Sequence, residues 1–368
     1  HGGYVTPRRV LQSLMAAGAR AARPGEFSMR AVIHGKIDLA QAEAIQEMIG
    51  ARNELAARAA RHTLSGALSR HLQDVLTKLY DCAGILEAWV DFPEEDLEFA
   101  SFDEVASFLE SASAQLRKLL ETYRKGQRCV EGVRICLVGI PNAGKSSLLN
   151  RLVGVDRAIV TDIPGTTRDL LESDWKVGGV HVKLLDTAGI RHTDEIIEAE
   201  GIRRSRQAIA DADIVLLVMD ASRIADSEQR ALARETPTDK TLIIWNKIDL
   251  APKKEDLSQA QWNHEMIEVS AQTGAGIQEL VQKLEERVWE GAPPAVDEIV
   301  LTQQRHAQAI EKALSCFEAV TEGLRSGISA EYVALEMRSG LHALASITGH
   351  HVTESVLGAI FARFCLGK

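Results

Sequence analysis

Apolar residues recur at helical spacing in two long stretches of the first third of the chain. From Leu68 to Trp89 they follow alternating four- and three-residue steps, which predicts a heptad seam on one long helix that ends near Asp91-Phe-Pro93. Ser101-Phe-Asp-Glu104 has the spacing of a capping box and predicts where a second long helix begins. The spacing leaves open whether the seam packs within the chain or against a second copy. The apolar positions are Leu68, Leu72, Val75, Leu79, Cys82, Leu86 and Trp89 on the first helix and Val105, Phe108, Ala112, Leu116, Leu119 and Tyr123 on the second.

Helical spacing returns after a linker at Gly291-Ala-Pro-Pro294, and Gly349 is the expected C-cap of the last of these helices. Neither helical stretch is expected to form a complete domain on its own. We therefore expect the two to pack together, with the intervening residues inserted between them as a separate domain. The apolar positions of the later stretch are Ile310, Leu314, Phe317, Val320, Leu324, Leu341, Leu344 and Ile347.

Short unbroken apolar runs between the two helical stretches predict strands at 133–138, 180–185 and 241–245. The first run leads into Gly139-Ile-Pro-Asn-Ala-Gly-Lys-Ser146 and then into a helix-like segment. Strand, glycine-rich turn and helix are the context that a phosphate-binding loop requires. Gly139 and Gly144 let the backbone N–H groups face phosphate, and the helix N-terminus favours negative charge. Lys145 would reach the β- and γ-phosphates, and the Ser146 hydroxyl would bind Mg²⁺.

Three further segments follow in the order that a guanine-nucleotide switch requires. In Asp162-Ile-Pro-Gly-Thr-Thr-Arg-Asp169, either Thr166 or Thr167 meets Mg²⁺ and the γ-phosphate. Asp186-Thr-Ala-Gly189 supplies a carboxylate near Mg²⁺ and a backbone N–H for the γ-phosphate. In Asn246-Lys-Ile-Asp249, the Asp249 carboxylate can accept two hydrogen bonds from guanine. Adenine lacks both donors and would leave this carboxylate unpaired.

Val269-Ser-Ala-Gln272 offers a backbone N–H to guanine O6. Together these segments predict a GTP-binding domain with Mg²⁺ held by Ser146 and Thr167. The residues expected at the nucleotide are Asn142, Ala143, Gly144, Lys145, Ser146, Ser147, Thr161, Asp162, Ile163, Pro164, Gly165, Thr166, Thr167, Asp186, Thr187, Ala188, Gly189, Asn246, Lys247, Asp249, Ser270, Ala271 and Gln272.

Composition narrows the class of protein. The 368 residues suffice for two or three domains, and no apolar run of transmembrane length or signal peptide is apparent, so no membrane insertion is expected. The five scattered cysteines predict reduced thiols in a cytoplasmic protein and suggest no zinc site. A net charge of -10 argues against binding nucleic acid through bulk electrostatics, although a local basic patch remains possible.

The chain resembles the MnmE (TrmE) family of bacterial tRNA-modification GTPases along its whole length. The segments that carry the resemblance are His1-Gly-Gly3, Ala22-Arg-Pro-Gly-Glu-Phe27, Lys36-Ile-Asp-Leu-Ala-Gln-Ala-Glu43, Asp91-Phe-Pro93, Pro141-Asn-Ala-Gly-Lys-Ser-Ser147, Gly165-Thr-Thr-Arg-Asp169 and Phe364-Cys-Leu-Gly-Lys368. The resemblance implies an α/β P-loop GTPase (Ras-like) domain inserted into an all-α helical domain, preceded by a partial α+β folate-binding domain. The expected bounds are 1–36 for the last third of the folate-binding and dimerisation domain, 37–130 and 293–368 for the helical domain, and 131–292 for the GTPase domain.

The resemblance also implies a function. Family members act as homodimers with the FAD-dependent protein MnmG and add an aminomethyl or carboxymethylaminomethyl group to C5 of the tRNA wobble uridine. The one-carbon unit comes from a tetrahydrofolate, either 5-formyl- or methylene-tetrahydrofolate. GTP hydrolysis accompanies dimerisation of the GTPase domains and is stimulated by K⁺.

Ile190 stands where Ras-type GTPases carry a water-orienting Gln, and Arg168 is the arginine nearest the predicted site. The resemblance implies instead that K⁺ binds through Asn142, Thr161, Ile163 and Thr166, and that a Glu after the Asp-Thr-Ala-Gly segment orients water. Glu198 is the favoured residue for this role, with Glu195 and Glu200 as competitors.

The same resemblance implies that Cys365 belongs to the modification centre, and that Lys36 and Lys368 contact folate. Sequence context alone favours Cys365 as a small buried hydrophobic residue, and the resemblance makes the two interpretations about equal. Two other functions stay open: a ribosome-assembly GTPase of the Era or Der type, and a regulatory GTPase switch without modification chemistry. The acidic balance, the helical flanks and the Cys-Leu-Gly-Lys tail argue against the Era or Der type. The tail, Lys36 and the Arg-Pro-Gly-Glu-Phe loop are the features that argue against a switch alone.

Overall fold

The computed structural model describes residues 3, 5–91, 101–157, 175–185, 206–223, 227–250, 264–350, 352, 354–362 and 364. The chain divides into two compact units. The helical unit contains His1–Ala51, Ala56–Gly126 and Asp297–Lys368, and the α/β unit contains Arg52–Leu55 and Gln127–Val296.

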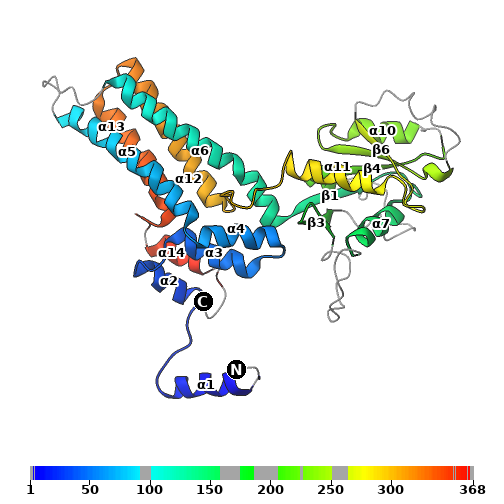
Figure 1. Ribbon diagram of the computed structural model, residues 1–368, viewed down its shortest axis with the longest axis horizontal. Coiled ribbons are helices and arrows are strands. Elements are labelled where there is room, and N and C mark those ends of the chain that lie inside the picture. Colours follow the sequence, from blue (N-terminus) through cyan, green and yellow to red (C-terminus); the bar gives the residue numbers. More distant parts are fainter. Residues whose placement is uncertain are drawn as a thin grey trace. The chain divides into compact units, whose positions relative to one another are not determined.

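The helical unit is built around four long helices that lie side by side, α5, α6, α12 and α13 (Figure 1). The predicted seam residues from Leu68 to Leu86 are buried in this single chain, against residues such as Leu116, Phe317 and Met337. The seam is therefore an intramolecular contact. The helices are α1 (Val5–Ala16), α2 (Glu26–Ile33), α3 (Leu39–Gly50), α4 (Glu54–Leu64), α5 (Ala67–Asp91), α6 (Phe102–Glu131), α12 (Gln304–Ser326), α13 (Ala330–Thr348) and α14 (Glu354–Phe361).

Local chemistry explains where these helices begin and end. The capping box before α6 is confirmed, because the Ser101 N–H donates to Glu104 Oε2 at 2.8 Å and the Glu104 N–H donates to Ser101 Oγ at 3.2 Å. A second capping box, formed by Asp38 and Gln41, opens α3. Gly349 ends α13 as predicted, with a φ of 96° that suits glycine.

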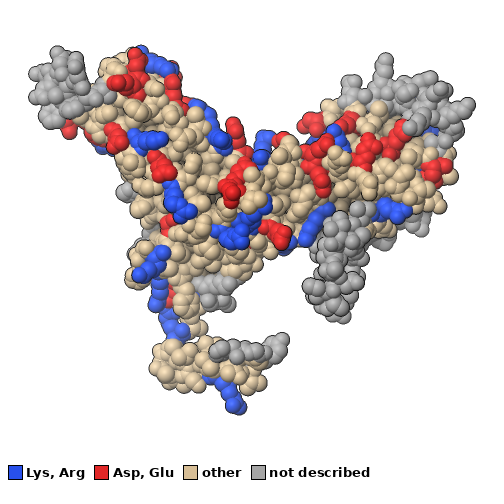
Figure 2. Space-filling model, viewed as in Figure 1, with Lys and Arg blue, Asp and Glu red and all other residues tan. Residues whose placement is uncertain are grey.

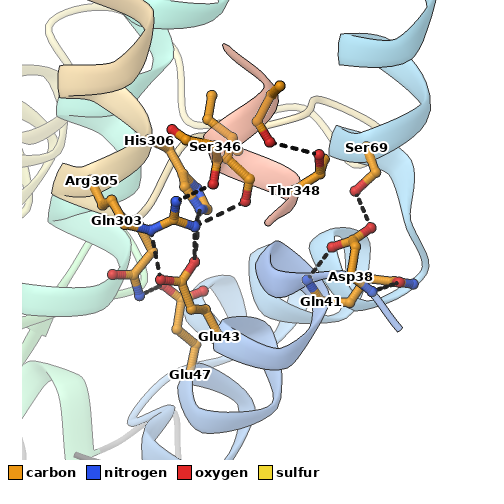
Figure 3. Close-up of polar contacts among 12 residues, drawn as sticks. Asp38, Gln41, Glu43, Glu47, Ser69, Gln303, Arg305, His306, Ser346 and Thr348 are labelled. Carbon is orange, nitrogen blue, oxygen red and sulfur yellow. Dashed lines mark hydrogen bonds and ion pairs between the residues drawn. The ribbon is translucent and has the colours of Figure 1, made fainter. Parts of the chain in front are cut away.

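A partly buried polar cluster joins three helical segments of this unit (Figure 3). We call Glu43, Glu47, Gln303, Arg305 and His306 the Glu43 cluster. Arg305 donates to both oxygens of Glu43 at 2.9 and 2.8 Å, and its Nη atoms also donate to the carbonyl oxygens at the end of α13. His306 Nε2 lies 2.8 Å from Glu43 Oε2, and Gln303 donates to Glu47 at 2.7 Å. The cluster therefore ties α3, the start of α12 and the end of α13 together.

The α/β unit contains a six-stranded sheet in the order β2-β3-β1-β4-β5-β6. All neighbouring pairs are parallel except β2 and β3, which form an antiparallel hairpin. Both faces of the sheet are covered, by α7 and α11 on one side and by α10 on the other. The elements are β1 (Val133–Val138), α7 (Lys145–Arg157), β2 (Lys176–Val177), β3 (Val180–Leu185), β4 (Ile214–Asp220), α10 (Ser227–Glu235), β5 (Thr241–Asn246), the 3-10 helix η1 (Ile248–Leu250), β6 (Glu265–Glu268) and α11 (Ile277–Trp289).

The three strands predicted from sequence are present as β1, β3 and β5. The central strand β4 was missed, although its seven residues are all buried and six of them form an apolar run. Such runs are typical of parallel strands that are covered on both faces.

Four cysteines, Cys82, Cys129, Cys136 and Cys316, are free thiols buried in the two units. Cys365 lies outside the described residues. No helix among the described residues is long and apolar enough to cross a membrane. On the face shown in Figure 2, acidic and basic side chains intermingle over the described surface instead of forming one broad basic field.

Candidate nucleotide-binding site

Three loops of the α/β unit follow the carboxyl ends of parallel strands. They are the glycine-rich loop after β1, the Asn246–Asp249 segment after β5 and the Ser270–Gln272 segment after β6. In open parallel sheets, ligands bind at this edge.

The glycine-rich loop owes its shape to residues that accept positive φ. Gly139, Asn142 and Gly144 have φ values of 152°, 61° and 93°. A Cβ atom on Gly139 would lie 2.3 Å from the carbonyl oxygen of Val218, and one on Gly144 would lie 2.3 Å from Asn246 Nδ2. Glycine is therefore required at both positions by space as well as by backbone conformation.

Lys145 begins α7 and folds back over this loop. Its Nζ atom donates to the carbonyl oxygens of Gly139 at 2.8 Å and of Ile140 at 2.9 Å. Ser146 and Ser147 are exposed in the first turn of the helix, where backbone N–H groups favour an anion. A phosphate placed there would give the Lys145 ammonium a charged acceptor, which binds more strongly than a neutral carbonyl.

Asn246 joins the three loops. Its side chain is 1% exposed, donates to the Ala143 carbonyl at 3.0 Å and accepts from the Ala271 N–H at 3.0 Å. The glycine-rich loop, the segment after β5 and the segment after β6 are thus fixed relative to one another. Sequence reasoning placed Asn246 at the nucleotide but gave no sign of this bridging role.

Lys247 is anchored by Asp220, the last residue of β4, which sequence reasoning missed. Lys247 has a φ of 68°, and its Nζ atom lies 2.6 Å from Asp220 Oδ2. Burial raises the pKa of Asp220, but hydrogen bonds from Lys247 and Ser222 outweigh it and hold that pKa below the usual range. The sequence contained a signal for Asp220, because this residue directly follows the apolar run of β4. Asp249, in η1, is exposed, as a group that receives a ligand must be.

Hydrogen bonds within the chain also hold the Ser270–Gln272 segment. Arg151, on α7, donates to the carbonyl oxygens of Ala271 at 3.1 Å and of Gln272 at 2.6 Å. Ser270 is buried, and its Oγ accepts from the Thr273 N–H at 3.1 Å. Arg151 was not foreseen, since nothing in the sequence relates it to a segment 120 residues away.

Several predicted site residues lie outside the described residues. These are Thr161, Asp162, Ile163, Pro164, Gly165, Thr166, Thr167, Asp186, Thr187, Ala188, Gly189, Glu198 with its competitors Glu195 and Glu200, Cys365 and Lys368. Lys36 is described and exposed; it follows α2 in the helical unit.

A glycine-rich loop between a central parallel strand and a helix, with Asn-Lys-x-Asp and Ser-Ala segments at the same sheet edge, defines a P-loop guanine-nucleotide-binding protein. The family comparisons match the MnmE helical domain at residues 39–365 and the N-terminus of the GTP-binding protein TrmE at residues 1–36. The chain belongs to the MnmE family of tRNA modification GTPases.

Named relatives match over the whole chain. The tRNA modification GTPase MnmE of Protochlamydia amoebophila is 46% identical, with 100% of this chain and 80% of the relative covered. That of Geobacter sulfurreducens is 38% identical, with 100% and 81% covered. Among solved structures, the G domain of the T. maritima FeoB iron transporter is 25% identical, covers 43% of this chain and 97% of its own, and has a TM-score of 0.29.

Proposed function

We propose that this chain hydrolyses GTP as a component of the enzyme that modifies C5 of the tRNA wobble uridine, together with an MnmG-type partner protein. The observation that carries the nucleotide assignment is the Asn246 side chain, because it links the phosphate loop to the segments that would read guanine. The relatives named above are tRNA modification GTPases, which supports tRNA as the substrate and hence a cytoplasmic site of action.

The residues present fit GTP and Mg²⁺. Gly144 lets the phosphate loop pack directly against Asn246, and the Lys145 ammonium lies over the same loop, where a phosphate would attract it. The Ser146 hydroxyl is exposed beside Lys145 and would bind Mg²⁺ with Thr167, and the bound cation would offset phosphate charge. Asp249 would accept the two donors that distinguish guanine from adenine.

We further propose that K⁺ assists hydrolysis when two GTPase domains of a homodimer face each other. Ile190 has no group that could orient water, and the phosphate loop contains no arginine, so both water orientation and charge stabilisation must come from other groups. Asn142 is exposed on the phosphate loop with a left-handed backbone, and we propose it as a K⁺ ligand with Thr161, Ile163 and Thr166. A cation there would stabilise the charge that develops on the β- and γ-phosphate oxygens. Glu198 would orient the attacking water.

The folate part of the proposal rests on the match of residues 1–36 to the TrmE N-terminus. Lys36 and Lys368 would contact a tetrahydrofolate that supplies the one-carbon unit. Cys365 would act beside them in the modification centre.

GTP turnover in KCl and in NaCl, measured over a range of protein concentrations, tests this proposal. We expect a rate that rises with K⁺ and with protein concentration. Asn142→Ala should lose the K⁺ effect and keep GTP binding, whereas Asn150→Ala, which removes an exposed asparagine from α7, should behave like the unaltered chain. Equal rates in the two salts would contradict the K⁺ mechanism and favour a switch that needs an outside activator.

A further inference from the structure

The β2–β3 hairpin connects the two segments predicted to sense the nucleotide. Residues 162–169 precede β2, and residues 186–189 follow β3 directly. At the opposite end, the hairpin turns at Gly178 and Gly179, whose φ values are 58° and 81°. Two successive positive φ angles are typical of a tight hairpin turn whose twist matches the strands. The hairpin is therefore a short element whose tip lies at one end and whose other end leads toward both predicted loops.

Two side chains of the same unit contact the tip. Trp289 Nε1 donates to the Gly178 carbonyl at 3.1 Å, and the indole is 3% exposed. A Cβ on Gly178 would lie 2.6 Å from that nitrogen, and one on Gly179 would lie 3.1 Å from Leu55 Cδ1. The two side chains therefore lie directly against the backbone of the tip, although Gly179 itself is exposed on its other side.

Both side chains stand close to places where the chain passes between the α/β unit and the helical unit. Leu55 is the last residue of the short Arg52–Leu55 segment, and Trp289 ends α11 ahead of the boundary at Val296. Hydrogen bonds link another of these passages, near Gln127, to residues beside Leu55 and Trp289. Asn53 Nδ2 donates to the Cys129 carbonyl at 2.8 Å, and Arg128 Nη1 donates to the Val288 carbonyl at 2.5 Å.

We propose that the tip of the β2–β3 hairpin couples the state of the bound nucleotide to these chain passages, with Trp289 as the positioning residue. This inference rests on the proposed GTP binding. A change in the loops at the open end of the hairpin shifts the tip, and the closely fitted Trp289 and Leu55 shift with it. The coupling requires only that the GDP-bound and GTP-bound states favour different positions of the β2–β3 hairpin.

Hydrogen exchange read by mass spectrometry tests the coupling in the full chain. The protein is compared in GDP and in a non-hydrolysable GTP analogue, with and without the substitution Trp289→Phe, which keeps an aromatic ring and removes the donor. We expect peptides covering residues 50–58 to exchange at rates that differ at least threefold between the two nucleotides. In Trp289→Phe the ratio of exchange rates in the two nucleotides should fall to about one. The affinity for each nucleotide should stay within about twofold of that of the unaltered chain.

Two further variants separate positioning from simple loss of stability. Gly178→Ala places a methyl group against the indole nitrogen and should also abolish the nucleotide-dependent difference. Leu284→Ala removes another buried side chain of α11, five residues before Trp289, and should keep the difference despite lower stability.

The coupling would be overturned if residues 50–58 exchanged equally in both nucleotides, or if Trp289→Phe kept the full difference. Either result with nucleotide binding intact leaves the proposed GTPase function standing. Loss of all guanine-nucleotide binding in the unaltered chain would instead overturn both proposals.

Discussion

The Glu43 cluster and the nucleotide-binding loops are both rich in polar side chains, but they use them in opposite ways. In the Glu43 cluster, Arg305 and His306 satisfy one carboxylate inside the protein; Glu43 and His306 are buried, and the other members are half-buried. At the nucleotide-binding loops, Asn246 and Asp220 are buried and hydrogen-bonded, whereas Ser146 and Asp249 are exposed. The polar groups of the Glu43 cluster bind one another. In the nucleotide-binding loops, buried polar groups form a frame that positions exposed groups for a ligand.

The difference shows how a binding site is assembled. Buried polar groups must find partners within the chain, because an unpaired one costs about 1 to 3 kcal/mol. Groups intended for a ligand can stay in water until it arrives. The frame therefore contributes to stability and geometry, and the exposed groups contribute to affinity. Substitutions in the two regions should separate these effects.

The largest effect on stability is expected from removing the central carboxylate of the Glu43 cluster. Glu43→Ala leaves Arg305 and His306 facing each other without a carboxylate, and should lower the free energy of unfolding by about 3 kcal/mol in a urea titration. GTP affinity should not change. Glu47→Gln is the matched control, because burial raises the pKa of Glu47 and an amide would keep a hydrogen bond to Gln303. Equal destabilisation by the two substitutions would contradict the assignment of Glu43 as the centre of the cluster.

A somewhat smaller effect, on affinity alone, is expected at the exposed end of the nucleotide site. Asp249→Asn removes a charged acceptor of two hydrogen bonds and should raise the Kd for GTP about 100-fold. It should favour xanthosine triphosphate, whose C2 carbonyl accepts from the new amide. Unfolding should shift by less than about 0.5 kcal/mol.

Asp239→Asn, an exposed aspartate of the same unit, provides the control for loss of charge and should leave the Kd for GTP unchanged. If Asp249→Asn left GTP affinity intact, guanine recognition would have to lie elsewhere.

The smallest effect concerns pH. Burial raises the pKa of Glu43, but hydrogen bonds from His306 and Arg305 outweigh it, so the folded-state pKa lies below the ordinary value. Its stabilisation is therefore present above the unfolded pKa of about 4.3 and is lost as pH falls through the folded value. The stability difference between the unaltered chain and Glu43→Gln should shrink as pH falls from 6 to 4, by at most about 0.6 kcal/mol.

Glu47 should show the opposite sign. Its raised pKa means that the fold favours the neutral form, a contribution that is present at low pH and lost as pH rises through the folded value. Urea titrations of Glu43→Gln and Glu47→Gln across this range check both signs. Parallel pH profiles for the two variants would contradict the opposed shifts.

The sequence predicted features that depend on residues close together in the chain. The Leu68–Leu86 seam, the Ser101–Glu104 capping box and the glycine-rich loop all have their determinants within about one element. The Glu43 cluster was not foreseen, because Arg305 lies 262 residues from Glu43 and each looks like an ordinary surface charge. Asn246 was placed correctly at the site, but its bridge to Ala143 depends on the assembled sheet.

The buried thiols have a consequence for chemical labelling. Cys82, Cys129, Cys136 and Cys316 are enclosed in packed cores, where a maleimide reagent cannot reach them in the native protein. Fast modification of the native chain would therefore report on Cys365 alone. The extent of maleimide labelling, with and without a tetrahydrofolate, would therefore measure the accessibility of the Cys365 sulfur. The other four cysteines would not need to be substituted.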